Sequence, residues 1–104
     1  MQTILLEKIK NVKERYLSDG VVIIGVFGSV ARGDEKRWSD IDITYQIDYD
    51  LFFEKYPDGF SQILKLEEIK EMLEKELQRK VDFISLSASS AGLKEEIEKD
   101  LVYV

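Results

Sequence analysis

The chain contains no cysteine and no histidine among its 104 residues, and it has a single proline and a single tryptophan. Without cysteine, disulfides, thiolate zinc sites and cysteine nucleophiles are excluded. Without histidine, the commonest general base and the commonest transition-metal ligand are also missing. A metal site in this protein must therefore use carboxylate and carbonyl oxygens, which suit magnesium, manganese or calcium.

Long apolar runs and an excess of basic residues are missing too. No segment approaches the ~20 apolar residues that cross a bilayer, and the N-terminus has no signal-peptide pattern. We therefore expect a cytoplasmic protein without a membrane partner. The net charge of −6 disfavours long nucleic acid as the main partner, because affinity for a phosphate backbone comes from clustered Lys and Arg. A nucleotide bound through a metal ion stays compatible with this charge.

The length and composition are those of one domain, which we expect to span residues 1–104. Hydrophobic residues make up 44% of the chain and charged residues 35%, the balance of an ordinary globular protein. A chain of this length leaves little room for a second core.

Helical and strand periodicities alternate in the order αβαβαβαβ, which predicts an α/β (α+β) fold with helices packed on a mixed sheet. The predicted helices cover residues 3–18, one or two turns within 28–33, residues 60–78, and a short segment after the serines at 87–90. The predicted strands cover residues 21–27, 40–48, 81–85 and 101–104, and the first of them is expected to be buried on both faces. Residues 49–60 hold an aromatic run around a Pro-Asp-Gly turn signal and fit neither periodicity.

Two aspartates at the start of the second predicted strand form the decisive pattern. Gly28-Ser29 is followed by ten residues and then by Asp40-Ile41-Asp42. Side chains at i and i+2 of a strand point to the same face, so Asp40 and Asp42 are expected to lie side by side. Two such charges repel each other unless a cation lies between them. They do not form a core pair, because the opposite face carries the apolar side chains of Ile41, Ile43, Tyr45 and Ile47.

A third carboxylate, Asp82, lies in the strand predicted over residues 81–85. It would join Asp40 and Asp42 if the two strands are neighbours. Three convergent carboxylates suit one or two Mg²⁺ or Mn²⁺ ions that hold a nucleoside triphosphate. Gly28 and Ser29 complement them, because a Gly-Ser turn between a strand and a helix directs backbone N–H groups and a hydroxyl towards an anion.

Positive charge for the phosphates would come from the segment between the two halves of the pattern. Arg32 is the first candidate, and pairing with Asp34 or Glu35 is its alternative role. Lys36 and Arg37 are further candidates, with a solvated loop as the simpler interpretation.

Simpler interpretations also exist for the other features. Asp40 and Asp42 would be solvent-facing charges on an exposed strand face, and a calcium loop of the EF-hand type is disfavoured because its Asp-x-Asp-x-Asp-Gly order is absent. The aromatic residues of 49–60 would pack in the core or a turn. If Phe52 and Phe53 are exposed, they would instead form a partner surface near the open side of the site.

The pattern Gly28-Ser29-x10-Asp40-x-Asp42, with Arg32-Gly33 inside it, resembles the signature of the DNA polymerase β-like nucleotidyltransferase superfamily. The resemblance is greatest to the minimal branch, the MNT domains, and covers nearly the whole chain. Residues 80–84 are similar to the strand that carries the third carboxylate of these proteins, and residues 93–103 to their closing helix and strand.

This resemblance implies a nucleotidyltransferase-type sheet and Mg²⁺-dependent transfer of a nucleoside monophosphate, AMP from ATP, to a hydroxyl acceptor. It implies that Asp40, Asp42 and Asp82 hold the metal, that Asp82 also prepares the attacking hydroxyl, and that Gly28 and Ser29 hold the β- and γ-phosphates. Minimal members are often antitoxins of HEPN-domain toxins, and some transfer AMP to a toxin tyrosine. A toxin of that kind is thus the implied partner, in a homo- or hetero-oligomer. The alternative is an antitoxin that neutralises its toxin by contact, with little or no catalysis.

Overall fold

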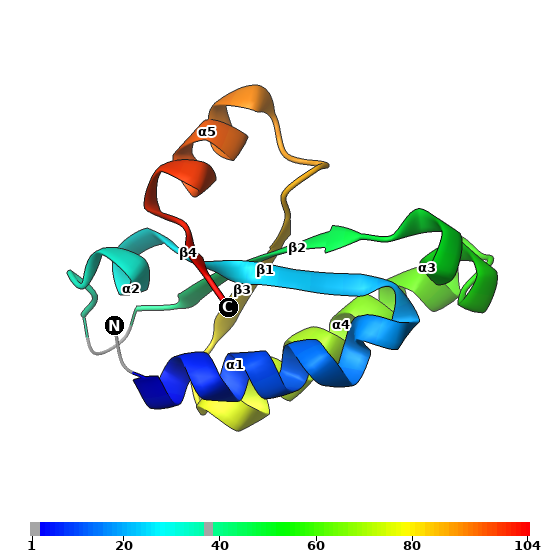
Figure 1. The fold of residues 1–104 in the computed structure, drawn as a ribbon, viewed down its shortest axis with the longest axis horizontal. Coiled ribbons are helices and arrows are strands. Elements are labelled where there is room, and N and C mark those ends of the chain that lie inside the picture. The colour runs from blue at the N-terminus through cyan, green and yellow to red at the C-terminus, as the bar shows by residue number, and fades with distance from the viewer. Residues whose placement is uncertain (1–2, 37–38) are drawn as a thin grey trace.

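The computed structural model describes residues 3–36 and 39–104, in which a four-stranded sheet carries helices on both faces (Figure 1). The strands are β1 (Val21–Phe27), β2 (Ile41–Ile47), β3 (Val81–Ser85) and β4 (Val102–Tyr103). The helices are α1 (Thr3–Tyr16), α2 (Gly28–Arg32), α3 (Tyr49–Lys55), α4 (Gly59–Leu77) and α5 (Ala91–Asp100), with a 3-10 turn, η1 (Leu17–Asp19), after α1.

The strand order is β3-β2-β1-β4. β1 is antiparallel to β2 and to β4, whereas β2 and β3 are parallel. Parallel neighbours need a crossover, and α3 and α4 supply it between β2 and β3. The predicted mixed sheet is therefore confirmed, and the C-terminal strand β4 forms one of its edges.

The main core lies between one face of the sheet and the helices α1 and α4, which run side by side beneath it (Figure 1). Ile69, Leu73 and Leu77 follow one another at i, i+4 and i+8 on α4 and are buried, as an amphipathic helix on a sheet requires. Ile41 and Ile43 of β2 contribute to the same core and have no solvent exposure.

A smaller apolar cluster covers the opposite face. There α5 contributes Ile97, which is fully buried against Phe27 of β1 and Leu86 after β3. β1 thus contacts apolar side chains on both faces, which explains its continuous apolar sequence and confirms the prediction made for it. Figure 1 shows α5 standing above the sheet, on the side away from α1 and α4.

Residues 49–60 form more regular structure than their sequence predicts. α3 occupies residues 49–55, so two helices rather than one lie between β2 and β3. Each begins at an aspartate cap: the Asp48 carboxylate accepts a hydrogen bond from the Leu51 N–H (3.4 Å), and that of Asp58 accepts one from the Ser61 N–H (2.8 Å). Short capped helices of this kind escape a periodicity search, because seven residues give only two turns.

Within the described part of the chain, no helix combines the length and the apolarity that membrane crossing requires.

Candidate active site

The three predicted carboxylates lie on neighbouring strands. Asp42 is the direct register partner of Asp82 on the parallel β2–β3 ladder, and Asp40 immediately precedes β2. Asp40 and Asp82 are exposed, whereas Asp42 is half-buried. The prediction that the strand of Asp82 pairs beside that of Asp42 is confirmed, and it places the two carboxylates on the same face of the sheet.

The electrostatic environment of Asp42 is unfavourable for a charged carboxylate. Burial raises the pKa of Asp42, and the negative charges of Asp82 and Asp40 raise it further, while Arg32 lowers it. A cation among the carboxylates would offset the effect of the two negative charges, those of Asp82 and Asp40. The donors are all carboxylate oxygens, which suit a hard cation such as Mg²⁺ or Mn²⁺. In residues 3–36 and 39–104, however, no three acidic side chains are already arranged to hold a metal ion.

Gly28 brings the chain into direct contact with Asp42. Its φ is 72°, in the left-handed region, and a β-carbon on residue 28 would overlap the Asp42 Oδ2 atom. Glycine is required here for both reasons, since other residues rarely adopt this φ and there is no room for a side chain. The Gly-Ser turn and the carboxylates are therefore parts of one site.

A tight cap ends α2 directly after this turn. The Gly33 N–H donates to the Val30 carbonyl (3.2 Å) and the Asp34 N–H donates to the Ser29 carbonyl (3.1 Å). This pair of bonds, with Gly33 at a φ of 81°, is a Schellman motif, and it confirms that Gly33 closes the helix. The first N–H groups of a helix have no intrahelical acceptor, so α2 offers N–H groups at the end where Gly28 meets Asp42.

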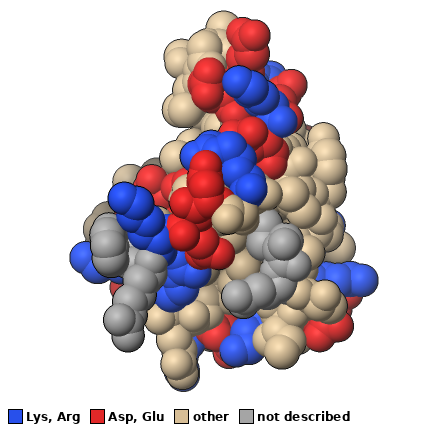
Figure 2. Space-filling view, turned by 90° about the vertical axis from the view of Figure 1, so that its left-hand side faces the viewer, with Lys and Arg blue, Asp and Glu red and all other residues tan. Residues whose placement is uncertain are grey.

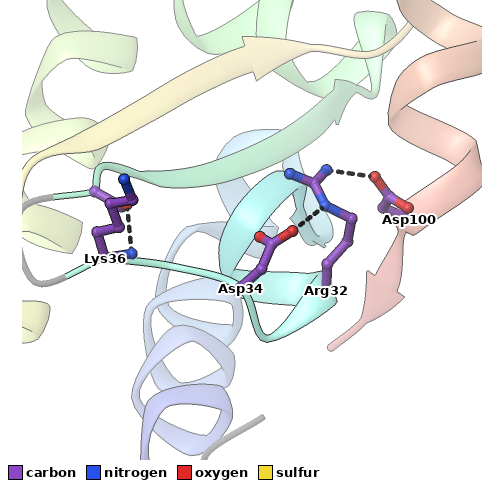
Figure 3. A network of polar contacts seen from close by, with 5 residues as sticks. Arg32, Asp34, Lys36 and Asp100 are labelled. Atoms are coloured by element: carbon purple, nitrogen blue, oxygen red, sulfur yellow. Dashed lines mark hydrogen bonds and ion pairs between the residues drawn. The ribbon is translucent and has the colours of Figure 1, made fainter.

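Arg32 forms two ion pairs, of which the one with Asp100 joins α2 to α5 (Figure 3). Its Nε donates to Asp34 Oδ2 (3.0 Å) and its Nη1 donates to Asp100 Oδ2 (2.8 Å). The alternative of pairing with Asp34 is thus observed, whereas Glu35 pairs with Arg79 instead. The guanidinium is exposed and close enough to Asp42 to lower its pKa. Contact of Arg32 with a phosphate remains a prediction.

The loop before Asp40 contains the other predicted cations. Lys36 is exposed, and its backbone N–H donates to the Ser39 Oγ (2.8 Å). The prediction for Arg37 lies outside the described residues. Figure 2, which views the side of the molecule to the left in Figure 1, shows acidic and basic side chains interspersed over this face, without one large basic patch.

Two polar residues near the carboxylates were not singled out from the sequence. Thr44 lies two residues after Asp42 on the same face, is fully buried, and donates its hydroxyl hydrogen to the Ile84 carbonyl (2.9 Å). Its place in the alternation of β2 is the signal that would have identified it. Arg79 follows α4, and its contacts with the loop before Asp40 become visible only in the folded chain.

The prediction of an aromatic partner surface beside the site is wrong. α3 follows the far end of β2, roughly 20 Å from Asp42 at about 3.3 Å per strand residue. Figure 1 shows α2 and α3 at opposite ends of the molecule. Moreover, Phe52 is 2% exposed and belongs to the core, because it lies on the inner side of α3, whereas Phe53 points outwards.

A cavity of about 240 Å³ lies at the edge of the sheet where Asp82 is found. The rings of Tyr45 and Phe83 stack at 4.2 Å between centroids and form part of its lining. α4 supplies the other wall through Ile63, Leu66, Glu67 and Lys70.

The fold and this site define a nucleotidyltransferase domain, and comparison with known proteins agrees. Residues 7–104 match the family described as polymerase beta, nucleotidyltransferase, and the chain belongs to it. The chain is similar to the protein adenylyltransferase MntA of Thermococcus cleftensis, with 36% identity over 104 residues that cover the whole chain and 92% of that protein.

Solved structures show the same fold. A protein described as a minimal nucleotidyltransferase superposes with a TM-score of 0.73 at 25% identity, covering 96% of this chain and 92% of that one. A toxin–antitoxin structure with AMP-PNP superposes with a TM-score of 0.66 at 25% identity, covering 89% of this chain and 66% of that one.

Proposed function

We propose that this protein transfers AMP from ATP to a hydroxyl group of a partner protein, with Mg²⁺ or Mn²⁺ as the metal. One observation carries the proposal: the Gly28 turn, Asp42 and Asp82 lie in a row across the ends of three neighbouring strands. The row offers N–H groups for phosphates, carboxylates for a metal, and a further carboxylate for the acceptor. The name of the Thermococcus relative, a protein adenylyltransferase, supports this choice of reaction.

The residues would divide the reaction among them. Gly28 and Ser29 hold the β- and γ-phosphates, with the Arg32 guanidinium as a further partner, and Asp40, Asp42 and Asp82 hold the metal. When bound, the metal neutralises charge on the phosphates and orients them. The acceptor oxygen forms a bond to the α-phosphorus, the bond between that phosphorus and pyrophosphate breaks, and Asp82 takes the acceptor proton.

We place the approach of the acceptor at the β3 edge of the sheet. Phosphates bound at Gly28 would lie on the β1 side of Asp42, which leaves the side of Asp82 for the attacking group. The cavity of about 240 Å³ opens on the α4 face of the same edge, opposite to the face of the Asp42 carboxylate, and it is smaller than the roughly 300–1,000 Å³ of typical small-molecule sites. It would therefore hold a side chain of the partner next to the acceptor, and not the reacting hydroxyl or a nucleoside. Its stacked aromatic rings would receive an apolar side chain of the partner.

A toxin is the partner that we propose, and the chain would act as its antitoxin in the cytoplasm. The toxin–antitoxin structure with AMP-PNP supports a complex of this kind. In one respect the structure favours the second candidate function, an antitoxin that works by contact. Among the described residues no three acidic side chains surround one metal position, and the side chains of Asp40 and Asp82 are exposed.

The experiment is a transfer assay on the purified chain with the HEPN-type toxin as acceptor. ATP labelled at the α-phosphate should label the toxin when Mg²⁺ is present, and ATP labelled at the γ-phosphate should not. Asp42→Asn should abolish the label while the complex still forms in a pull-down. If the complex forms but neither the unaltered chain nor Asp42→Asn labels the toxin, the result would support neutralisation by contact and contradict the enzymatic proposal.

A thermal melt series checks the nucleotide site without the partner. ATP and Mg²⁺ together should raise the unfolding temperature by more than the sum of the shifts that each gives alone, because phosphate oxygens complete the metal shell.

A further inference from the structure

Asp40 lies outside the secondary structure that holds the other carboxylates. β2 begins one residue later, at Ile41, and the Asp40 side chain is exposed, so side-chain packing does not hold it. Its position depends on its backbone neighbours. On one side the Ile41 N–H donates to the Lys80 carbonyl (2.9 Å), and on the other side lies Ser39.

The guanidinium of Arg79 holds the Ser39 side of this junction. Its Nη2 donates to the Ser39 carbonyl (2.5 Å) and its Nη1 donates to Glu35 Oε2 (2.7 Å). The Arg79 and Glu35 side chains are 29% and 28% exposed, so both partners of this ion pair are partly buried, whereas the Arg32 side chain is 47% exposed. Arginine suits the position, because its planar fork makes two directed hydrogen bonds at once.

The chain around Arg79 is arranged to present this side chain. Gln78 ends α4 with a φ of 53°, and it is the one residue other than glycine in 3–36 and 39–104 with a positive φ. This costly conformation turns the chain from α4 into β3 within a few residues. The first amide of β3 is held as well, since the Val81 N–H donates to Glu74 Oε2 (3.1 Å).

Arg79 therefore connects the two strands that carry the carboxylates. It lies three residues before Asp82 and donates to the carbonyl that directly precedes Asp40. The Ser39 end of the contact is itself ordered, because the Ser39 N–H donates to the Lys36 carbonyl (3.0 Å). A shift of Ser39 would move Asp40 relative to Asp82, and misplacement of a metal ligand by a fraction of an ångström weakens the site.

We propose that Arg79 is a positioning residue for the metal site: by clamping Ser39 and Glu35 it fixes Asp40 at the distance from Asp42 and Asp82 that a shared cation needs. This inference rests on the proposed function for its metal-dependent part. Arg79 also fixes the backbone at Asp40 in the protein without metal or nucleotide, and this role is independent of the proposed function.

The test compares Arg79→Met with Arg79→Lys, Glu35→Gln and, as a matched loss of an exposed arginine elsewhere, Arg15→Met. Binding of the non-hydrolysable analogue AMP-PNP is measured by calorimetry across a Mg²⁺ titration. Arg79→Met should raise the Mg²⁺ concentration for half-maximal binding by about 10-fold, the lower end of losses seen when a group that orients a metal ligand is removed. Arg79→Lys and Glu35→Gln should each raise this Mg²⁺ concentration less than Arg79→Met does. Arg15→Met should have the same Mg²⁺ dependence as the unaltered chain.

A double-mutant cycle separates positioning from general destabilisation. In an Asp40→Asn background, Arg79→Met should change the Mg²⁺ dependence by less than about twofold, because the ligand it positions is already gone. Equal effects of Arg79→Met in both backgrounds, or none in either, would overturn the proposal.

A second readout uses the protein free of metal and nucleotide. Amide hydrogen exchange at Asp40 and Ile41 should be faster in Arg79→Met than in Arg15→Met, because the clamp on Ser39 is lost. Unchanged exchange at these amides would contradict the clamp itself. If the unaltered chain bound no Mg²⁺ and AMP-PNP at all, the proposed function would fail, whereas the exchange result would still decide the role of Arg79.

Discussion

Gly28 and the carboxylate of Asp42 are packed so closely that no β-carbon fits between them. The contact joins the end of β1 to the start of β2, which are antiparallel neighbours. It places the N–H groups at the start of α2 next to the carboxylate that we propose as a metal ligand. Triphosphate and metal would therefore meet at this contact, and several predictions about the site depend on it.

Gly28→Ala should abolish AMP transfer and lower the free energy of unfolding by about 1 kcal/mol or more, because residue 28 has a φ of 72° and no free space. The matched control is Gly92→Ala on α5, where nothing lies near a new β-carbon. That change should be neutral or stabilise by up to about 1 kcal/mol, since alanine favours helix. Urea unfolding and the labelled-toxin assay measure the two effects. An active, stable Gly28→Ala protein would show that the contact is not needed.

The raised pKa of Asp42 predicts a pH-dependent cost in the metal-free protein. Because the folded-state pKa lies above the unfolded one, the charged carboxylate disfavours folding at neutral pH, and the cost disappears as the pH falls through the raised pKa. In EDTA at pH 7.5, Asp42→Asn should therefore be more stable than the unaltered chain, by no more than about 1 kcal/mol at this half-buried site.

The advantage of Asp42→Asn should shrink as the pH is lowered towards the ordinary aspartate value of about 3.9. Glu98→Gln, an exposed change on α5, controls for the loss of one negative charge. Urea unfolding at several pH values measures both variants. A destabilised Asp42→Asn protein at pH 7.5 would show that the carboxylate has a structural role instead.

Arg32 should contribute more to the binding of triphosphate than to the free energy of unfolding. Its two ion pairs are exposed and contribute little to folding, so Arg32→Ala should change the free energy of unfolding by less than about 1 kcal/mol. Loss of a charge-assisted contact with phosphate should weaken binding of ATP with Mg²⁺ by about 10-fold, corresponding to about 1.4 kcal/mol. Lys94→Ala on the exposed side of α5 is the matched control. Calorimetry that gives equal affinities for the two variants would remove Arg32 from the phosphate site.

Two exposed apolar surfaces are candidates for the contact with the acceptor protein. Ile63 on α4 lines the cavity beside Asp82, whereas Phe53 on α3 lies near the far end of β2; both are exposed. Ile63→Glu should reduce labelling of the toxin several-fold and leave ATP binding unchanged, and Phe53→Ser should affect labelling much less. A larger loss of labelling in Phe53→Ser than in Ile63→Glu would show that the toxin contacts α3 instead. Phe52 does not serve in this test, because it is a core residue whose truncation to Ala should cost about 3–5 kcal/mol.

Several elements follow from local sequence alone. The β-branched run at residues 21–27 forms β1, the alternation after Asp40 forms β2, and the serine cap at Ser90 begins α5. Each of these patterns can be recognised within a short stretch of consecutive residues. α3 escaped prediction, because two turns that begin at an aspartate cap leave too little periodicity to recognise.

What the sequence by itself determined was the type of chemistry: no cysteine or histidine, a Gly-Ser turn, and two carboxylates on one strand face. The neighbours of these residues were decided only by the tertiary structure. Asp82 pairs with Asp42 because α3 and α4 return the chain to the parallel side of β2, and Arg79 reaches Ser39 across 40 residues of sequence. The same return places α3 at the far end of β2 from Asp42. Such contacts depend on which strands pair and which helices bury them, and no local pattern encodes that, because the core forms only when the whole chain closes on it.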